Sequence, residues 1–457
     1  MIERMLWPDP DDREPPQRSS AFAIRGFVRP LRLTFHDAGL DNLPAAEAVA
    51  LRVVEGFASR LSAFDAVRTG VGPRPYIRFS EATESVPKRP PIAEIYADGK
   101  IRQRGTMYQA AALPRVAARL LDENGTDLAV LTRDLTIIEA HRSLGRDILI
   151  TNADYLLKHR FERFINEGNP HTPTQALKMV ALFLRTCENF TYAADASYLA
   201  SANRGEFYRQ LTLARLANME HYVHACAGTG LGDLGHTVRE RCTRALEALD
   251  AIGAQFYALP NGDTIDRMLY HFDYLTLLLV GAFDVMALVT HRAFDIADID
   301  PKFAKFTNDH FIAALQRVGA TAHLAVVTKQ RWHTLQALLY DLRNMIHTTT
   351  MTTALSIIDG NEGPAYAVVS HDRWRQLWKA VEREGGLDHW GMQIEADIRI
   401  EPYTYATRLI AYCFAAITDL AEATLQVPTF AAGIAQIPET NERINELGMR
   451  RQIGLLG

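Results

Sequence analysis

The pattern of apolar and polar positions divides the chain near residue 155. Before this point, residues 30–35 and 74–80 are rich in alternating, β-branched or aromatic side chains, which predicts short strands. Residues 43–64 place apolar side chains at the 3.6-residue period of a helix. The segment 84–100 is interrupted by prolines and is expected to enter a short strand at "AEIYA" before a turn at "DGK".

Two further apolar runs flank a helix-length segment. "LAVL" at 128–131 and "DILIT" at 147–151 predict a βαβ-like unit with parallel strands. We therefore expect a small α/β domain over residues 21–157. Residues 1–20 are acidic and proline-rich and lack the apolar core of a signal peptide, so they are expected to form a loosely ordered tail.

Helical periodicity dominates residues 158–457, which predicts a mainly α fold with a large helical bundle after the α/β domain. Thr172 is a candidate N-cap ahead of Pro173 at the first helical position. Residues 360–370 predict a loop followed by a short strand. The sequence contains no internal repeat of fixed period. Helices are expected over residues 172–200, 205–228, 236–259, 308–328, 371–385 and 404–425.

One apolar segment, residues 268–290, is long enough to span a bilayer. It contains His271, Asp273 and Asp284, and each charge at mid-membrane costs roughly 2.5–3.5 kcal/mol. We therefore interpret the segment as the fully buried central helix of a soluble bundle, apolar on all sides. The expected location is the cytoplasm, with no membrane partner.

Composition narrows the class of protein further. The chain has 457 residues, of which 48% are hydrophobic and 23% charged, so it can bury two or three cores. A net charge of −5 excludes a surface that is basic throughout, but it permits a local basic groove. The four cysteines form no C-x-x-C pair, which indicates neither a zinc site nor a disulfide framework. Phosphate-binding glycine motifs and the G-x-S-x-G elbow are absent, so no cofactor is expected.

The strongest candidate chemistry lies in "LLYDLRNMIHTTTM", residues 338–351. Arg343 and His347 are four residues apart and therefore share one face of a helix. They flank an apolar stripe, where a side chain is partly desolvated but reachable. Arginine clamps phosphates and histidine transfers protons near neutral pH, which are the two tasks of a metal-independent ribonuclease. Asn344 could orient the substrate or hold the helix end. The stripe consists of Leu335, Leu338, Leu339, Leu342 and Ile346.

A structural interpretation of the same residues stays open. Arg343 could pair with an acidic residue, and His347 could bond a backbone carbonyl. The motif would then be a bracket inside a catalytically silent helical scaffold or interaction protein.

The segment "DLRNMIHTTTM", preceded by the helix "YHFDYLTLLLVGAFDVMA", resembles proteins of the HEPN superfamily. These are helical bundles, often dimeric; many are RNases of toxin–antitoxin, antiviral and stress-response systems, and others are non-catalytic. Their signature is an arginine with a polar follower and four to six residues before a histidine. Arg343 and Asn344 match it. Only three residues separate Arg343 from His347, and Thr348 occupies the position of the second histidine found in many relatives.

The resemblance covers roughly residues 205–425 and implies a metal-independent endoribonuclease of a bacterial defence or toxin–antitoxin system. It implies RNA as the substrate, a homodimer, and an antitoxin or defence-system partner protein. Arg343, Asn344 and His347 of two protomers would line one groove. Just upstream, Lys329, Arg331 and Trp332 are candidate RNA contacts, through phosphate pairing and base stacking.

Two other clusters are weaker candidates for metal binding. Glu220 and His224 share a helical face, but no second Glu-x-x-His accompanies them. Asp37, Asp134 and Asp154 follow predicted strands, where parallel sheets place ligands, so a Mg²⁺-dependent nuclease in the α/β domain is a further alternative. For Asp134 and Asp154 we favour helix capping.

Overall fold

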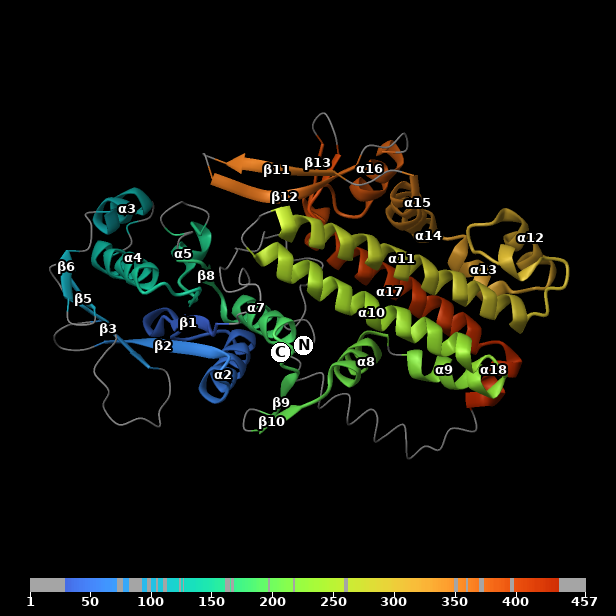
Figure 1. The fold of residues 1–457 in the computed structure, drawn as a ribbon, viewed down its shortest axis with the longest axis horizontal. Coiled ribbons are helices and arrows are strands. Elements are labelled where there is room, and N and C mark those ends of the chain that lie inside the picture. Colours follow the sequence, from blue (N-terminus) through green and yellow to red (C-terminus); the bar gives the residue numbers. More distant parts are fainter. Residues whose placement is uncertain are drawn as a thin grey trace.

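The computed structural model describes residues 29–434, except 72–76, 82–92, 97–99, 104–105, 110–112, 123–124, 126, 161–164, 166–167, 196–197, 217, 259–261, 349–351, 359–360, 370–373 and 395–397. The predicted tail (1–20) and the predicted "DGK" turn lie outside the described residues, apart from Lys100. An α/β region stands at one end of an elongated molecule, and a long helical region occupies the rest (Figure 1). The predicted order of an α/β part followed by a mainly helical part is confirmed.

The α/β region is built on one mixed sheet with the strand order β6-β5-β4-β3-β2-β1-β7-β8. The pairs β2–β1, β1–β7 and β7–β8 are parallel. From β2 the sheet continues through β3, β4, β5 and β6 in antiparallel pairs. The predicted strands at 30–35, 74–80 and "AEIYA" are confirmed as β1, β3 and β4. The strands are β1 (Leu31–Phe35), β2 (Phe64–Val71), β3 (Ile77–Glu81), β4 (Ala93–Ile95), β5 (Lys100–Gln103), β6 (Thr106–Gln109), β7 (Ile148–Ile150) and β8 (Pro170–His171).

Helices cover both faces of this sheet, and apolar side chains of its central strands are buried on each face. On one face, Leu31, Leu33 and Phe35 of β1 join a core that continues without a break into the helical region. On the other face, Val67 and Leu149 pack in a separate cluster. The first face is covered by α2 (Ala45–Arg60) and α7 (Pro173–Thr186), and the second by α3 (Leu113–Leu121), α4 (Leu128–Ser143) and α5 (Asp154–Lys158).

The predicted βαβ-like unit is wrong in one part. "LAVL" forms the first turn of α4, with Asp127 as the N-cap, whose side chain accepts a hydrogen bond from the Ala129 amide. A short apolar run cannot be assigned to a strand or a buried helix from its periodicity alone. The parallel partners of β7 are instead β1 and β8.

The sheet continues past the predicted boundary at residue 157, because β8 and the covering helix α7 both follow it in the chain. Thr172 caps α7 as expected. Its hydroxyl accepts from the Gln175 amide, and the Gln175 side chain accepts from the Thr172 amide, which completes a capping box.

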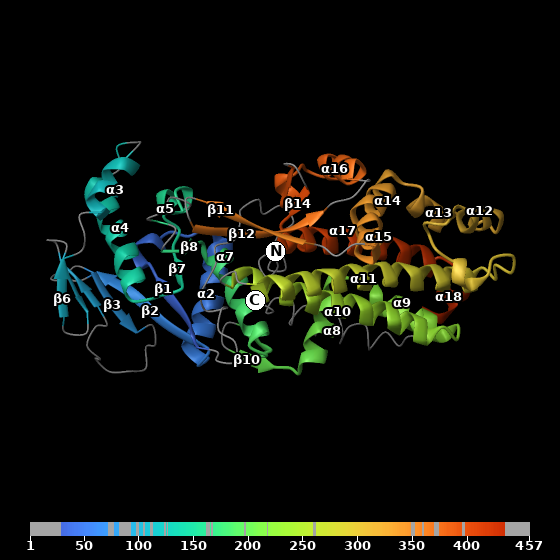
Figure 2. The same ribbon diagram turned by 45° about the horizontal axis from the view of Figure 1, so that its top comes forward.

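Three long helices, α10 (Gly232–Tyr257), α11 (Gly262–Ala293) and α17 (Pro402–Leu425), run side by side along the helical region (Figures 1 and 2). Shorter helices surround them. These are α8 (Arg204–Arg215), α9 (Met219–Gly228), α12 (Asp309–Arg317), α13 (Thr321–Val327), α14 (Gln330–Leu335), α15 (Asp341–Thr348), α16 (Trp374–Arg383) and α18 (Pro428–Ile434), with the short turns η3 (Pro301–Phe303) and η5 (Asp388–Trp390). A further short turn, η2 (Asp37–Gly39), follows β1 in the α/β region.

The central apolar helix is confirmed as α11, but its burial is incomplete. α11 is long and apolar enough to cross a bilayer, and 67% of its most apolar 18-residue window is buried by the rest of the chain. Tyr270, Tyr274 and Leu277 are exposed along one side of its first half, at 67%, 36% and 39%. The prediction of a helix that is fully buried is therefore wrong for the first half of α11.

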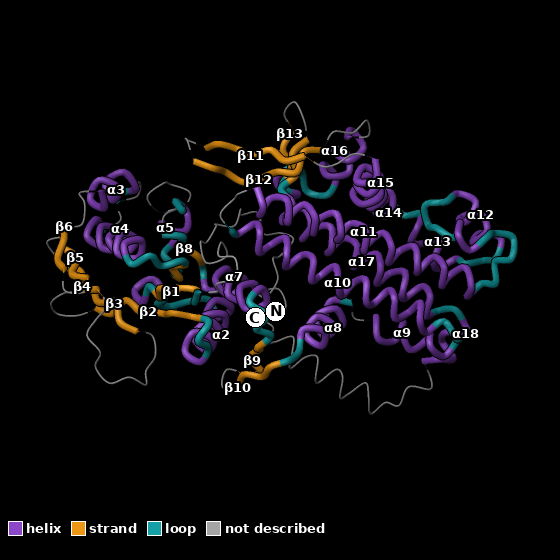
Figure 3. Tube along the Cα trace, in the orientation of Figure 1, coloured by secondary structure: helices purple, strands orange, loops and turns teal. Residues whose placement is uncertain are grey.

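Strands also occur where only helices were expected. The predicted helix at 172–200 ends at Thr186, and β9 (Thr191–Asp195) and β10 (Tyr198–Ser201) form a hairpin. The predicted strand at 360–370 is confirmed as β12 (Asn361–Val369), within a sheet of order β11-β12-β14-β13 that lies beside α16 (Figure 3). Its other strands are β11 (Thr352–Ile358), β13 (Met392–Ile394) and β14 (Ile398–Ile400).

A buried ion pair crosses the helical core. The Arg185 guanidinium donates to both carboxylate oxygens of Asp250, with N–O distances of 2.6 and 3.0 Å. The Tyr208 hydroxyl donates to the same carboxylate at 2.7 Å. Burial, together with this carboxylate, raises the pKa of Tyr208, so the phenol stays protonated and keeps donating.

Stability is expected to fall on acidification because of His323, which is buried beside Thr424. Burial lowers the pKa of His323 from 6.5 to about 4. Between these values the unfolded chain binds the proton more tightly, so the free energy of unfolding decreases as the pH falls, by up to about 1.4 kcal/mol per pH unit. Urea denaturation at pH 7 and pH 4.5 should show a smaller loss in His323→Gln than in the wild type; an equal loss in both would contradict this assignment.

Candidate functional site

A cavity of about 500 Å³ opens beside the predicted motif. Its walls come from α11, from the segment between α11 and α12, from the helix that contains Arg343, and from α16. Figure 2 shows α16 lying over α14 and α15, outside the long helices. A volume of this size suits a small ligand or part of a polymer. We call it the Arg343 pocket.

The helix beside the pocket is not regular. α14 and α15 are joined by a π-helical turn, η4 (Gln336–Tyr340), so the helix runs from Gln330 to Thr348 with one widened turn. Widened turns of this kind are frequent at functional sites. The predicted apolar stripe is confirmed in its described members: Leu335, Leu338, Leu339 and Leu342 are buried, and the side chain of Ile346 lies outside the described residues.

Arg343 lies at the border between this stripe and the pocket. Its Nη1 donates to the Asn344 Oδ1 at 3.1 Å, and Asn344 also lines the pocket. The Arg343 Nε is buried and has no hydrogen-bond partner within the described part of the chain. His347 falls on α15, but its side chain is not among those described, so its predicted role in proton transfer stays a prediction.

The lining of the pocket is rich in cations. Four permanently charged side chains contribute, against two carboxylates, Asp284 and Asp341. His333 adds an imidazole. The excess of positive charge favours an anionic ligand, and arginine together with lysine favours phosphate in particular. The four cations are Lys305, Arg343, Lys379 and Arg383.

The position of Asp284 in the pocket shifts the pKa of its carboxyl group. Desolvation raises its pKa, while Lys305, Arg343 and Arg241 oppose the shift. The Lys305 Nζ lies 3.9 Å from its Oδ2. Arg241 reaches this region from α10 across Gly281, where any side chain would collide with the guanidinium. A partly buried carboxyl with a raised pKa can exchange a proton closer to neutral pH than an exposed one.

The upstream RNA candidates divide into two kinds. Lys329 and Arg331 are exposed, and the Arg331 guanidinium lies over the Tyr412 ring, 4.9 Å from its centroid. Trp332 is only 2% exposed and packs edge-on against Phe283 and Phe306. The predicted stacking of Trp332 on a base is therefore wrong for this conformation, because the indole is buried against these two rings.

The three aspartates of the α/β region do not form a metal site. Asp37 follows β1 and pairs with Arg68. Asp134 comes from the interior of α4, not from a strand end or a cap, and it contacts His36, Arg133 and Tyr155. Asp154 is the first residue of α5 and makes no capping hydrogen bond. Among the described residues, no three His, Cys, Asp or Glu side chains converge as metal ligands.

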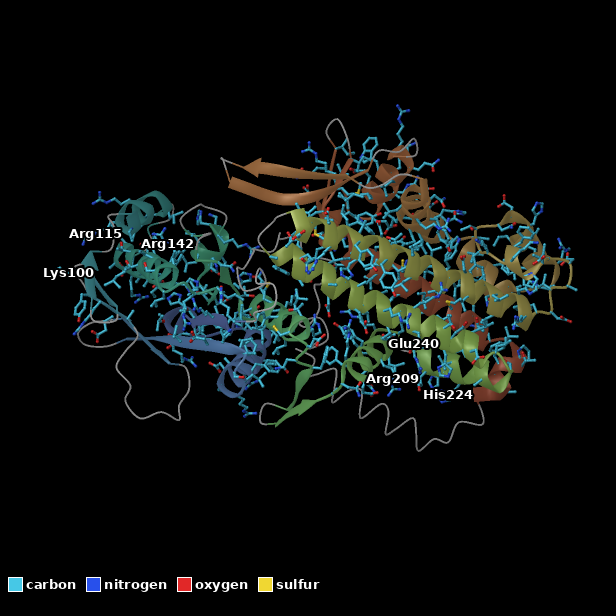
Figure 4. All side chains as sticks on the ribbon, in the orientation of Figure 1. Lys100, Arg115, Arg142, Arg209, His224 and Glu240 are labelled. Atoms are coloured by element: carbon cyan, nitrogen blue, oxygen red, sulfur yellow. The ribbon has the colours of Figure 1, made fainter. Side chains whose placement is uncertain are left out.

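Glu220 and His224 do not form a metal site either, because each side chain interacts with another group. The Glu220 carboxylate faces Arg239 at 3.7 Å, and the His224 Nδ1 lies 2.8 Å from the Glu220 carbonyl oxygen. Figure 4 places His224 on α9, at the outer end of the helical region. Cys187, Cys226, Cys242 and Cys413 are all free thiols.

Sequence reasoning missed most of the pocket's cations. Lys305, Lys379 and Arg383 are 38, 36 and 40 residues from Arg343 in the sequence. The packing of α16 on η4, which helical periodicity does not predict, brings Lys379 and Arg383 to the pocket. One local signal was present: Lys379 and Arg383 are four residues apart in "WKAVER" and so share a helical face. Nothing in the sequence showed that this face turns toward Arg343.

Comparison with models of known protein families, with curated protein sequences and with solved structures gives no match. The resemblance to the HEPN superfamily therefore rests on the motif alone.

Proposed function

We propose that this chain is an RNA-directed, HEPN-like protein, a metal-independent endoribonuclease that binds a phosphate of its substrate in the Arg343 pocket. The observation behind the proposal is the position of Arg343: it borders a cavity in which permanent cations outnumber carboxylates by two. Its Nε is buried without a partner among the described residues, so a phosphate oxygen would complete its hydrogen bonding.

Metal-independent cleavage of RNA proceeds in three steps. A base removes the proton of the ribose 2′-hydroxyl, the oxygen attacks the adjacent phosphorus, and the 5′-oxygen leaves with a proton, which yields a 2′,3′-cyclic phosphate. Arg343 would stabilise the charge on the phosphorane, held in place by Asn344. His347 remains the proposed proton-transfer group, and the pocket lining offers Asp284 and His333 as further groups that can exchange protons.

The cations of the pocket belong to one chain, so phosphate binding does not itself need a second protomer. A homodimer, an antitoxin or defence-system partner protein and a cytoplasmic location are retained as parts of the proposal. They rest on the resemblance to the HEPN superfamily and on the interpretation of α11 as a core helix.

The test is cleavage of single-stranded and hairpin RNAs by the full chain in a buffer that contains EDTA. Persistent cleavage that depends on Arg343 supports the proposal. Cleavage abolished by EDTA would favour the alternative of a Mg²⁺-dependent nuclease. Failure to bind or cleave any of these RNAs would contradict the proposal and favour a catalytically silent scaffold.

A further inference from the structure

Two cations of the Arg343 pocket, Lys379 and Arg383, come from a separate helix, α16. Lys379 and Arg383 lie four residues apart on α16 and both line the cavity, together with Ala380 and Gln376 of the same helical face. Arg343 and Asn344 line it from α15. A ligand in the pocket would therefore meet positive charge from two helices.

Neither Lys379 nor Arg383 makes an ion pair or a hydrogen bond with any residue that the structure describes. Both side chains are exposed. Like charges four residues apart on a helix repel each other and destabilise it. An anion between them would remove this repulsion, and the pocket is the space that both side chains border.

The charge of the pocket indicates what kind of anion fits. Its permanent cations exceed its carboxylates by two. An internal phosphodiester contributes one negative charge, whereas a phosphomonoester contributes about −1.5 to −2 at pH 7 and offers three acceptor oxygens. The more highly charged group matches the pocket better, because each added oxygen can accept from a separate cation.

We infer that Lys379 and Arg383 form a subsite for a phosphomonoester, the phosphorylated end of an RNA strand, in the pocket that Arg343 also lines. This inference rests on the proposed function, since it takes the ligand to be RNA. Arg343 holds the phosphate next to the reacting ribose, and the α16 pair selects the phosphorylated end. The protein would then act near strand ends in preference to internal positions.

The experiment compares one fluorescent oligoribonucleotide in three forms: with hydroxyl ends, with a 5′-phosphate and with a 3′-phosphate. Binding to the full chain is measured by fluorescence anisotropy at a fixed, moderate salt concentration, because phosphate contacts depend on salt. We expect one of the phosphorylated forms to bind about tenfold more tightly than the hydroxyl form, as one added charge-assisted contact provides. 5′-AMP and 3′-AMP are included as competitors, to separate recognition of a strand end from recognition of a free nucleotide.

The Lys379→Ala/Arg383→Ala variant should lose the preference for the phosphorylated end, so that its affinities for the three RNAs become equal. The matched control is Arg115→Ala/Arg119→Ala, which removes two exposed cations at the same spacing from α3. Figure 4 labels Arg115 at the far end of the α/β region. The control should keep the preference.

The outcomes separate the two proposals. Equal affinity of the wild type for all three RNAs, with binding that still depends on Arg343, overturns the end subsite alone. A preference that survives in the α16 variant also overturns it. Competition by the free nucleotides as strong as by the phosphorylated RNA assigns the subsite to nucleotides and overturns the strand-end assignment. No binding of any RNA overturns the proposed function together with the inference.

Discussion

Replacing Arg343 by alanine is expected to lower the rate of RNA cleavage by about 10²–10³-fold, because it removes the cation that would stabilise the developing phosphorane charge. RNA binding should weaken by a smaller factor, since Lys305, Lys379 and Arg383 remain in the pocket. The rate is measured under single-turnover conditions with EDTA present, and the affinity by anisotropy with the same RNA.

Two further variants make this result specific. Arg343→Lys keeps the charge but loses the planar fork that binds two phosphate oxygens, so it should restore binding more than cleavage. Arg115→Ala, which removes a distant exposed arginine, should leave both unchanged. If Arg343→Ala cleaves like the wild type, or loses activity only because its melting temperature falls, Arg343 has a structural role and the proposed function is wrong.

Replacing Asp250 by alanine is expected to lower the free energy of unfolding by about 3–5 kcal/mol. The substitution leaves the Arg185 guanidinium buried without its carboxylate, and it removes the acceptor of the Tyr208 hydroxyl. Urea denaturation followed by circular dichroism measures the change.

The control is Glu247→Ala, which breaks the partly exposed pair of Glu247 with Arg204. Exposed pairs contribute about 0–1 kcal/mol, so this variant should be close to the wild type. A loss below about 1 kcal/mol for Asp250→Ala would mean that solvent or another group compensates Arg185, and that the buried network does not stabilise the helical core.

Long periodic segments were the part of the fold that could be predicted. α10, α11 and α17 each repeat apolar residues over more than twenty positions. The start of α7 is marked in the sequence by Thr172 at the N-cap and by Pro173 at the first helical position. "LAVL" was misassigned because four apolar residues fit a buried helical turn as well as a strand. The hairpin β9–β10 was missed because its residues follow a strong helical signal without a proline or glycine to end it.

The site was predictable only along one helix. Arg343 and Asn344 could be placed beside an apolar stripe because both belong to the same periodic segment. The burial of Trp332 depends on Phe283 and Phe306, which are distant in the chain. The presence of Lys379 and Arg383 in the same pocket as Arg343 likewise depends on distant segments. Contacts of this kind arise from tertiary packing, which local patterns do not encode.

The most direct test of the central claim is to map where RNA touches the full chain. An RNA that contains 4-thiouridine is crosslinked by light, and the modified peptides are identified by mass spectrometry. We expect crosslinks in the peptides that contain residues 329–344 and 374–383, and their loss in Arg343→Ala. Crosslinks confined to the α/β region, or none above the level of an unrelated protein, would contradict it.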